Sequence, residues 1–295
     1  MPVTDSTLTY SIIVPCYNEE AAVARTIDHL LANESDPSTF ELIVVNDGST
    51  DSTREILEEY EARYSNVHLL HHSSNQGYGA SLKTGIRKAR AELIAITDAD
   101  GTYPNERLPE LVAACKEHDM VVGARTADGA EYSKLRAAPK FFLQRWMSWI
   151  ARQHIPDINS GMRVFRKSIA ERFIGILPDG FSFTVTITLA MLTNYRPTLF
   201  VPITYRKRIG QSKLRPFRDT LRFVALILRT GTYFAPLRVF FPFVGLLFLM
   251  VVVSLVYDVV HLGNLTDKTV LLFLFALNAG MFALLADMID KRSMR

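Results

Sequence analysis

The sequence is poor in cysteine and lacks an N-terminal export signal. Its two cysteines are Cys16 and Cys115, and the N-terminal stretch MPVTDSTLTYSIIVPCYNEE has neither a basic segment nor a cleavage site. We therefore expect no secretory signal, and nothing indicates a disulfide framework.

Charge is missing from two long stretches near the C-terminus. The 19 residues from Val239 to Tyr257 and the 18 residues from Thr269 to Ala286 contain no Asp, Glu, Lys or Arg. Each is close to the roughly 20 residues that cross the hydrocarbon core of a bilayer. Both are predicted to be transmembrane helices, joined as a hairpin. Two buried helices of a soluble core are the alternative, but neither stretch has a polar face.

Acidic residues are scarce before the first stretch. Between Tyr205 and Arg238, nine Lys or Arg residues stand against Asp219 alone, although the net charge of the chain is only +3. Lys291, Arg292 and Arg295 follow the second stretch. By the positive-inside rule, the N-terminal domain and the C-terminus are predicted to be cytoplasmic in an integral membrane protein. In that reducing compartment the two cysteines need not pair.

The first 200 or so residues alternate between strand and helix patterns. Apolar strands are predicted in YSIIVPCYNEE, where Pro15 breaks the strand, and in FELIVVNDGSTD, VHLLHH and LIAITDAD. Helical spacing follows each of the first three, and Ser52 is placed to cap the second helix. This alternation predicts an α/β fold with a mostly parallel sheet, in which ligands bind at the carboxyl ends of the strands.

Carboxylates follow three of these strands. Glu19, Asp47, Asp98 and Asp100 are expected to meet at one edge of the sheet. Four carboxylates there would repel one another, and a divalent cation that also binds a diphosphate would relieve the repulsion. In the alternative, Asp98 or Asp100 caps the helix NERLPELVAACKEH, for which Asn105 is the better-placed cap.

Six ordered motifs resemble one family. The chain is similar to family 2 glycosyltransferases of the GT-A fold (Rossmann-like), and within them to the polyisoprenyl-phosphate glycosyltransferases, a group that includes dolichol-phosphate mannose synthases. The resemblance spans about Tyr10 to Leu214, and a two-span C-terminal hairpin also occurs in the group. The motifs are IVPCYNEE, VVNDGSTD, NQGYGASLKTG, TDADGTYP, NSGMRVFRK and YRKRIGQSK.

The resemblance implies donor and metal sites. A nucleotide-sugar donor would be bound by Pro15, Tyr17, Glu19, Val45, Asp47, Asp98, Ala99 and Asp100. Asp98 and Asp100 are the implied catalytic residues and would hold Mg²⁺ or Mn²⁺. Close relatives of the dolichol-phosphate mannose synthases have a glutamine as a further metal contact two residues after the second aspartate. Thr102 stands there in this chain, and its hydroxyl is predicted to bind the metal directly or through water.

Cations are the candidates for binding the phosphate of the acceptor lipid, since arginine matches phosphate oxygens in bidentate fashion. The family pairs one arginine with the lysine of its last motif, and Arg206 and Arg208 both flank that position. A solvated surface role is the alternative for any single cation. The candidates are Arg125, Arg136, Ser160, Arg163, Arg206, Arg208 and Lys213.

The expected reaction is transfer of a hexose from a GDP-mannose- or UDP-glucose-type donor to dolichyl or undecaprenyl phosphate. A phosphate monoester is already anionic at neutral pH, so an in-line displacement with inversion needs no general base. The expected partners are the donor, the polyprenyl phosphate and the membrane, and nucleic acid is not expected. Association with further copies of the chain is left open by the sequence.

Two segments, PKFFLQRWMSWIARQHI from Pro139 to Ile155 and PFRDTLRFVALILRTGTYF from Pro216 to Phe234, interleave aromatic residues with cations. Both are predicted to be interfacial helices, with ordinary amphipathic core helices as the alternative. The predicted organisation is a GT-A domain over residues 1–213, an interfacial helix over 214–236, two transmembrane helices within 237–290 (about 239–257 and 269–286) and a tail over 291–295.

Parts of the sequence also fit two rival functions. TDADGT also resembles the motif of haloacid-dehalogenase-type phosphatases, in which Asp98 would be the nucleophile. That motif normally lies on the first strand of its domain, and no later acidic pair of the expected kind is found. A catalytically inactive membrane scaffold is the second rival, and the intact Asp98 and Asp100 pair argues against it.

Overall fold

The computed structural model describes residues 8–33, 36–127, 137–180, 182–206, 228–229, 231–233 and 235–293. The chain divides into two compact units. The first consists of residues 1–148 with 153–216, and the second of residues 149–152 with 217–295. The boundary predicted between residues 213 and 214, and most of the predicted interfacial helix over 214–236, fall outside the described residues.

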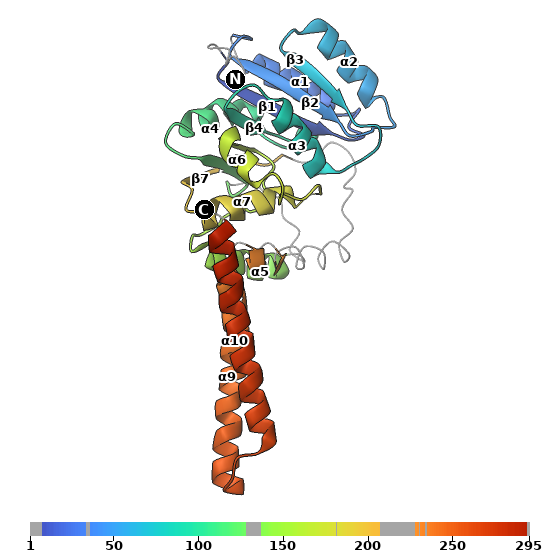
Figure 1. Ribbon diagram of the computed structural model, residues 1–295. Coiled ribbons are helices and arrows are strands. Elements are labelled where there is room, and N and C mark those ends of the chain that lie inside the picture. The colour runs from blue at the N-terminus through green and yellow to red at the C-terminus, as the bar shows by residue number, and fades with distance from the viewer. Residues whose placement is uncertain are drawn as a thin grey trace. The chain divides into compact units, whose positions relative to one another are not determined.

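The first unit is built on a seven-stranded sheet with the order β3-β2-β1-β4-β6-β5-β7 (Figure 1). β3, β2, β1 and β4 run parallel, β6 is antiparallel to both of its neighbours, and β5 pairs in parallel with β7. The mostly parallel α/β prediction is therefore confirmed. The strands are β1 (Tyr10–Cys16), β2 (Phe40–Asn46), β3 (Val67–His71), β4 (Leu93–Ile96), β5 (Met120–Ala124), β6 (Arg163–Arg166) and β7 (Thr198–Pro202).

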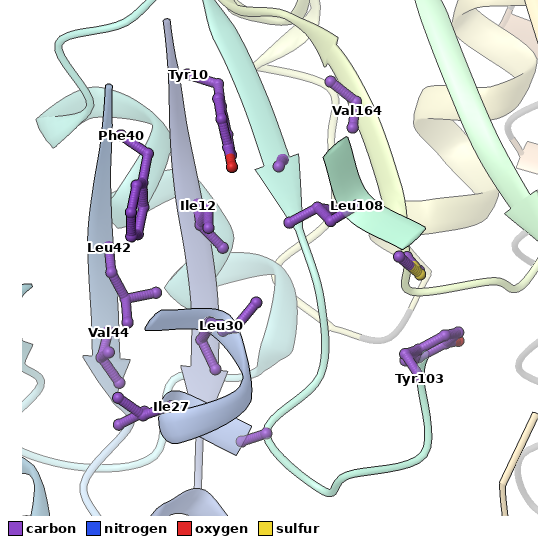
Figure 2. Packing of buried hydrophobic residues seen from close by; sticks show 14 of the residues in the cluster. Tyr10, Ile12, Ile27, Leu30, Phe40, Leu42, Val44, Tyr103, Leu108 and Val164 are labelled. Carbon is purple, nitrogen blue, oxygen red and sulfur yellow. The ribbon is translucent and has the colours of Figure 1, made fainter. Parts of the chain in front are cut away.

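Helices cover both faces of this sheet. Because side chains alternate along a strand, β1 packs Ile12 against Ile27 and Leu30 of α1 on one face (Figure 2), and Ile13 with Leu82 of α3 on the other. The described helices of this unit and the short 3₁₀ turn η1 are α1 (Val23–Ala32), α2 (Thr53–Arg63), α3 (Tyr78–Lys88), η1 (Asn105–Arg107), α4 (Leu108–Ala114), α5 (Ala137–Ala151), α6 (Lys167–Phe173) and α7 (Phe183–Thr193).

Three local predictions were wrong. Pro15 does not break β1, because β1 pairs with β4 only as far as Ile13, so no ladder bond on that side needs its missing N–H. Ser52 precedes α2 but makes no capping bond through its side chain; the Asp51 carboxylate accepts from the N–H of Thr53 instead. The Asn105 side chain accepts a bond from the Thr97 hydroxyl at 2.7 Å and caps no helix.

A buried carboxylate ties together the amino-terminal end of the sheet. Glu41 in β2 is 1% exposed and accepts hydrogen bonds from the Ser11 hydroxyl (2.6 Å), the Arg90 N–H (2.7 Å) and the Arg90 guanidinium (2.8 Å). Burial opposes ionisation of Glu41, but these donors outweigh it and hold the pKa of its carboxyl below the ordinary value.

Replacing this carboxylate is expected to destabilise the domain. Glu41→Gln turns an amide N–H₂ group toward the donors of Ser11 and Arg90. This is expected to lower the free energy of unfolding by about 2 kcal/mol and the melting temperature by roughly 4–8 °C. Because the folded-state pKa is depressed, the wild-type contribution is full above the unfolded pKa and is lost as the pH falls through the folded pKa. Melting of the full chain in detergent at neutral and acidic pH tests this; the exposed Glu58→Gln is the control, and equal melting of both variants contradicts the assignment.

The second unit contains a hairpin of α9 (Pro236–Tyr257) and α10 (Asp267–Ser293) (Figure 1). Both helices are long and apolar enough to cross a membrane, and only 11% and 17% of their most apolar windows is buried. Leu247 and Val251 of α9 pack with Ala276 of α10. The low burial sets these helices apart from core helices of a soluble domain.

A polar cluster lies where the hairpin turns. α9 continues into a π-helical turn, η3 (Asp258–Leu262), and Asp258 is fully buried. Its Oδ2 accepts hydrogen bonds from the N–H and hydroxyl of Thr266 and from the hydroxyl of Thr269, at 2.6–2.9 Å. Asp258 thus caps the start of α10 from the end of the preceding helix, a contact that the charge pattern alone did not predict.

Candidate active site

Three strand ends lie side by side at one edge of the sheet. Cys16 at the end of β1 pairs with Asn46 at the end of β2, and Ile13 of β1 pairs with Ile96 at the end of β4. The segments that carry Glu19, Asp47 and the Asp98–Asp100 pair therefore start from neighbouring strands. Among the described residues, however, no group of three or more His, Cys, Asp or Glu side chains could hold a metal.

Asp98 is held in place from two sides. Its Oδ1 accepts a hydrogen bond from the Tyr78 hydroxyl at 3.0 Å. On the other side lies Gly161, where an added Cβ would fall 2.7 Å from Oδ1 and 2.8 Å from Oδ2. The Gly161 N–H donates to the Tyr103 hydroxyl at 2.6 Å. Burial, followed by the Asp98 charge, raises the pKa of both Tyr78 and Tyr103, so both phenols stay protonated at neutral pH.

Asp100 is oriented by the residue two positions later. The Thr102 N–H (3.2 Å) and hydroxyl (2.6 Å) both donate to Asp100 Oδ1. Thr102 is fully buried, and Gly101 between them has φ +71°, a left-handed conformation that favours glycine. The structure therefore places the predicted metal residue Thr102 against Asp100.

Asp47 anchors a loop. It is 3% exposed and accepts from His72 Nδ1 (2.7 Å) and the N–H groups of Gln76 (2.9 Å) and Gly77 (2.8 Å). His72 Nε2 lies 3.0 Å from the Thr84 hydroxyl. Asp47 thus fixes the backbone immediately before Tyr78, which in turn contacts Asp98.

The other predicted donor-binding residues differ in exposure. Pro15, Tyr17 and Glu19 are half-buried at the end of β1. Val45 is fully buried in the core and Ala99 is 2% exposed, with its carbonyl accepting from the Thr26 hydroxyl. Neither of these last two residues is therefore open to a ligand in this structure without repacking.

Arg125 makes a bidentate ion pair with Asp157. Nε lies 2.6 Å from Oδ2 and Nη2 lies 2.9 Å from Oδ1 of the buried Asp157. The guanidinium also lies 5.1 Å from the ring centroid of Tyr205, which meets Tyr103 edge-on. Arg125 is thus connected, through the ring of Tyr205, to Tyr103, whose hydroxyl accepts from the Gly161 N–H beside Asp98.

Two further predicted acceptor residues face inward. Ser160 donates to the Gly123 carbonyl at 2.5 Å. Arg163 is fully buried and donates to the carbonyls of Ser160 and Thr184 and to the Thr188 hydroxyl. Burial lowers the pKa of Arg163 to about 10, which leaves it charged at neutral pH. These bonds tie the Ser160–Gly161 segment to α7.

Arg206 lies at the surface, where its guanidinium pairs with Glu106 at 2.5 Å. The main-chain N–H of Arg206 donates to the Thr102 carbonyl. Arg136, Arg208 and Lys213 lie outside the described residues. Asp98 therefore contacts Tyr78 and Gly161, and Asp100 is bonded to Thr102. The side chains of Ser160 and Arg163 point into the protein interior.

Sequence reasoning missed several residues of this site. Tyr78 and Gly161 stand inside the quoted motifs NQGYGASLKTG and NSGMRVFRK, yet no role was predicted for them. Asp157 lies just before the motif NSGMRVFRK. A single acidic residue before a segment rich in cations was the signal that could have indicated its ion pair. No role in the site was predicted for His72 either, although it bonds to Asp47.

The model of glycosyl transferase family 2 matches residues 11–174, more than half of the chain, and the chain belongs to this family. This assignment overturns the phosphatase alternative. A second model, the GtrB C-terminal hairpin, matches residues 235–291.

Two curated relatives and one solved structure illustrate the similarity. A dolichyl-phosphate hexose transferase of Haloferax volcanii is 30% identical, over 70% of this chain and 87% of the relative. A dolichyl-phosphate beta-glucosyltransferase of Trichomonas vaginalis is 32% identical over 54% of this chain, and the match spans only 52% of that relative's length. Glucosyl-3-phosphoglycerate synthase from Mycobacterium tuberculosis, solved with Mn²⁺, UDP and phosphoglyceric acid, has a TM-score of 0.57 at 17% identity, covering 77% of this chain and 80% of that one. At that identity the likeness supports the GT-A fold alone.

The contact between Gly161 and Asp98 leads to a direct prediction. Gly161→Ala places a methyl group inside contact distance of both carboxylate oxygens and displaces Asp98. A shift on the order of 1 Å is expected to lower glycosyltransferase kcat/KM about 100-fold. Gly175→Ala is the matched control, because nothing lies within 4 Å of its added Cβ. The measurement is activity beside the melting temperature; a folded Gly161→Ala protein with wild-type activity contradicts the assignment.

Proposed function

We propose that this protein transfers a hexose from a nucleotide sugar, of the GDP-mannose or UDP-glucose type, to a polyprenyl phosphate such as dolichyl or undecaprenyl phosphate. The observation that carries the proposal is the fixed Asp98 and Asp100 pair at the carboxyl edge of a family 2 sheet, in a chain that also has an apolar hairpin. The names of the two curated relatives support a polyprenyl-phosphate acceptor.

Asp98 and Asp100 would hold Mg²⁺ or Mn²⁺. Two carboxylates with no third acidic or His ligand among the described residues suit a hard cation that completes its shell with diphosphate oxygens and water. Thr102 contributes through Asp100, whose orientation it sets. When bound, the cation neutralises charge on the departing diphosphate. The solved neighbour with Mn²⁺ and UDP supports this choice of metal and ligand.

The reaction is proposed as one in-line displacement. An oxygen of the lipid phosphate attacks the anomeric carbon while the bond from that carbon to the diphosphate oxygen breaks, so the configuration inverts and an α-linked donor gives a β-linked product. The phosphate is the anionic nucleophile, so the protein need only align and bind the two substrates. Arg163 is proposed to fix the Ser160–Gly161 segment beside Asp98, and Arg125 to hold the neighbouring segment through its ion pair with Asp157.

The hairpin is proposed to anchor the protein in a membrane with the catalytic domain and C-terminus on the cytoplasmic side. The nine cations between Tyr205 and Arg238 support this orientation. The helix α5, predicted to be interfacial, has Trp149 45% exposed while Met147 and Ile150 are buried, which suits one face turned to lipid headgroups.

Tyr78 acts through Asp98. Tyr78→Phe keeps the ring and removes the hydroxyl donor, so the Mn²⁺ concentration for half-maximal activity is expected to rise about 10-fold. Tyr60→Phe is the control, because its hydroxyl makes a comparable 2.7 Å bond to Asp28 in a different part of the domain. Unchanged Mn²⁺ dependence in Tyr78→Phe would show that the bond does not support the metal site.

The function itself is tested with a panel of donors. Detergent-purified protein is incubated with a polyprenyl phosphate, Mg²⁺ or Mn²⁺ and several UDP- and GDP-sugars, and nucleoside diphosphate release is measured. We expect lipid-dependent release with one donor, its loss in Asp100→Asn, and an inverted anomeric configuration by NMR. A folded protein that releases nothing with any donor would favour the inactive scaffold, and retained configuration would refute the displacement mechanism.

A further inference from the structure

Two segments that are far apart in the sequence fix the Asp98 carboxylate. Tyr78, at the start of α3, donates a hydrogen bond to it, and a side chain at Gly161, before β6, would fill its space. A third segment contacts both of these. It consists of the loop 178–180 and the helix α7, together called the α7 segment.

The loop of the α7 segment lies against the start of α3. The Asp179 carbonyl accepts from the Ala80 N–H at 3.0 Å, and the Asp179 carboxylate pairs with Lys83, three residues further along the helix, at 2.8 Å. The first N–H groups of a helix have no partner within it, and Gly77, which precedes α3, has no side chain to supply one. The Asp179 carbonyl therefore takes the place of a cap on α3.

Gly79 allows the loop to come this close. A Cβ added there would lie 2.1 Å from the Pro178 carbonyl oxygen, and 3.0 Å from both the Asp179 carbonyl carbon and the Gly180 carbonyl oxygen. These three nearest atoms all belong to the main chain, which cannot rotate away as the end of a side chain can. A side chain at Gly79 would therefore push the loop away from α3.

The helix of the α7 segment holds the other neighbour of the carboxylate. Arg163 donates through Nη1 to the Thr184 carbonyl (3.0 Å) and to the Thr188 hydroxyl (2.9 Å), both in α7. The same guanidinium donates to the Ser160 carbonyl, next to Gly161. Because Arg163 and Thr188 are both fully buried, water cannot readily replace these bonds.

We propose that the α7 segment is a positioning element that makes the place of the Asp98 carboxylate depend on both neighbouring segments at once. Asp179 holds the start of α3, and Thr188 holds the guanidinium of Arg163. Both are positioning residues, since they act on Asp98 through other residues. Displacing the loop at one end of the segment should therefore loosen the chain at the other end. This inference rests on the proposed function, in which Asp98 holds a divalent cation.

Mn²⁺ binding to the full chain in detergent, followed by electron paramagnetic resonance with UDP or GDP present, tests the α7 end. Thr188→Val keeps the shape of the side chain and removes the hydroxyl that accepts from Arg163. Thr186→Val is the matched control. Both hydroxyls are buried in α7 and donate to the carbonyl four residues earlier, that of Ser182 for Thr186 and that of Thr184 for Thr188.

Thr188→Val is expected to weaken Mn²⁺ binding about 3- to 10-fold, because residues behind a metal ligand set its orientation. Thr186→Val is expected to bind as the wild type does. A folded Thr188→Val protein that binds Mn²⁺ as tightly as Thr186→Val would overturn the proposal.

Amide hydrogen exchange of the metal-free full chain tests the coupling from the α3 end. Gly79→Ala displaces the loop 178–180, whereas the matched control Gly180→Ala adds a methyl group to the same loop where nothing lies within 4 Å. Exchange of the Gly161 N–H, which donates to the Tyr103 hydroxyl, is expected to rise on the order of 10-fold in Gly79→Ala and not in Gly180→Ala. Peptides from β2 are expected to exchange as in the wild type in both variants.

Exchange at Gly161 that stays at the wild-type rate in Gly79→Ala, or that rises together with exchange throughout β2, would overturn the coupling. The same measurements separate this inference from its premise. A wild-type protein that binds no Mn²⁺, or releases no nucleoside diphosphate with any donor, contradicts the proposed function, and the exchange result, which needs neither metal nor donor, still decides the inference. An active wild type whose Gly79→Ala and Thr188→Val variants match their controls contradicts the inference alone.

Discussion

The candidate site depends on the position of the Asp98 carboxylate, which its neighbours fix. The carboxylate accepts from the Tyr78 hydroxyl and occupies the space that a side chain at Gly161 would fill, so it can keep its place only if the start of α3 and the segment before β6 are both correctly positioned. Asp47 fixes the start of α3 through its bonds to the loop before Tyr78. Arg163 fixes the segment before β6 through its bond to the Ser160 carbonyl. Buried polar groups with complete hydrogen bonding rigidify such a site.

These supports also explain how buried charges are used in the domain. Asp47 and Arg163 are nearly inaccessible, and each forms hydrogen bonds to two backbone groups and to one side chain. A buried charge is costly unless it is paired or bonded, so residues of this kind are retained where they order a segment that nothing else holds. The Arg125–Asp157 pair plays the same part beside Tyr205.

Four of the seven strands, the helices that follow the first three of them and the apolar hairpin could be predicted, because they follow from periodicity and from runs without charge, which are local features of the sequence. The strands β5, β6 and β7 were not predicted. The Asp98 and Asp100 pair could be predicted because it ends a strand. The partners of Asp47, Asp157 and Arg163 could not, since they depend on which segments meet across the sheet edge. The capping role of Ser52 failed for a local reason, because the neighbouring Asp51 accepts the bond from the Thr53 N–H instead.

The most direct test of the account is Mn²⁺ binding followed by electron paramagnetic resonance on the detergent-purified full chain. If Asp98 and Asp100 hold a cation that a diphosphate completes, adding UDP or GDP should tighten Mn²⁺ binding at least about 10-fold, and Asp98→Asn should abolish the effect. Binding that is equally strong without the nucleotide, or unchanged in Asp98→Asn, would contradict the account.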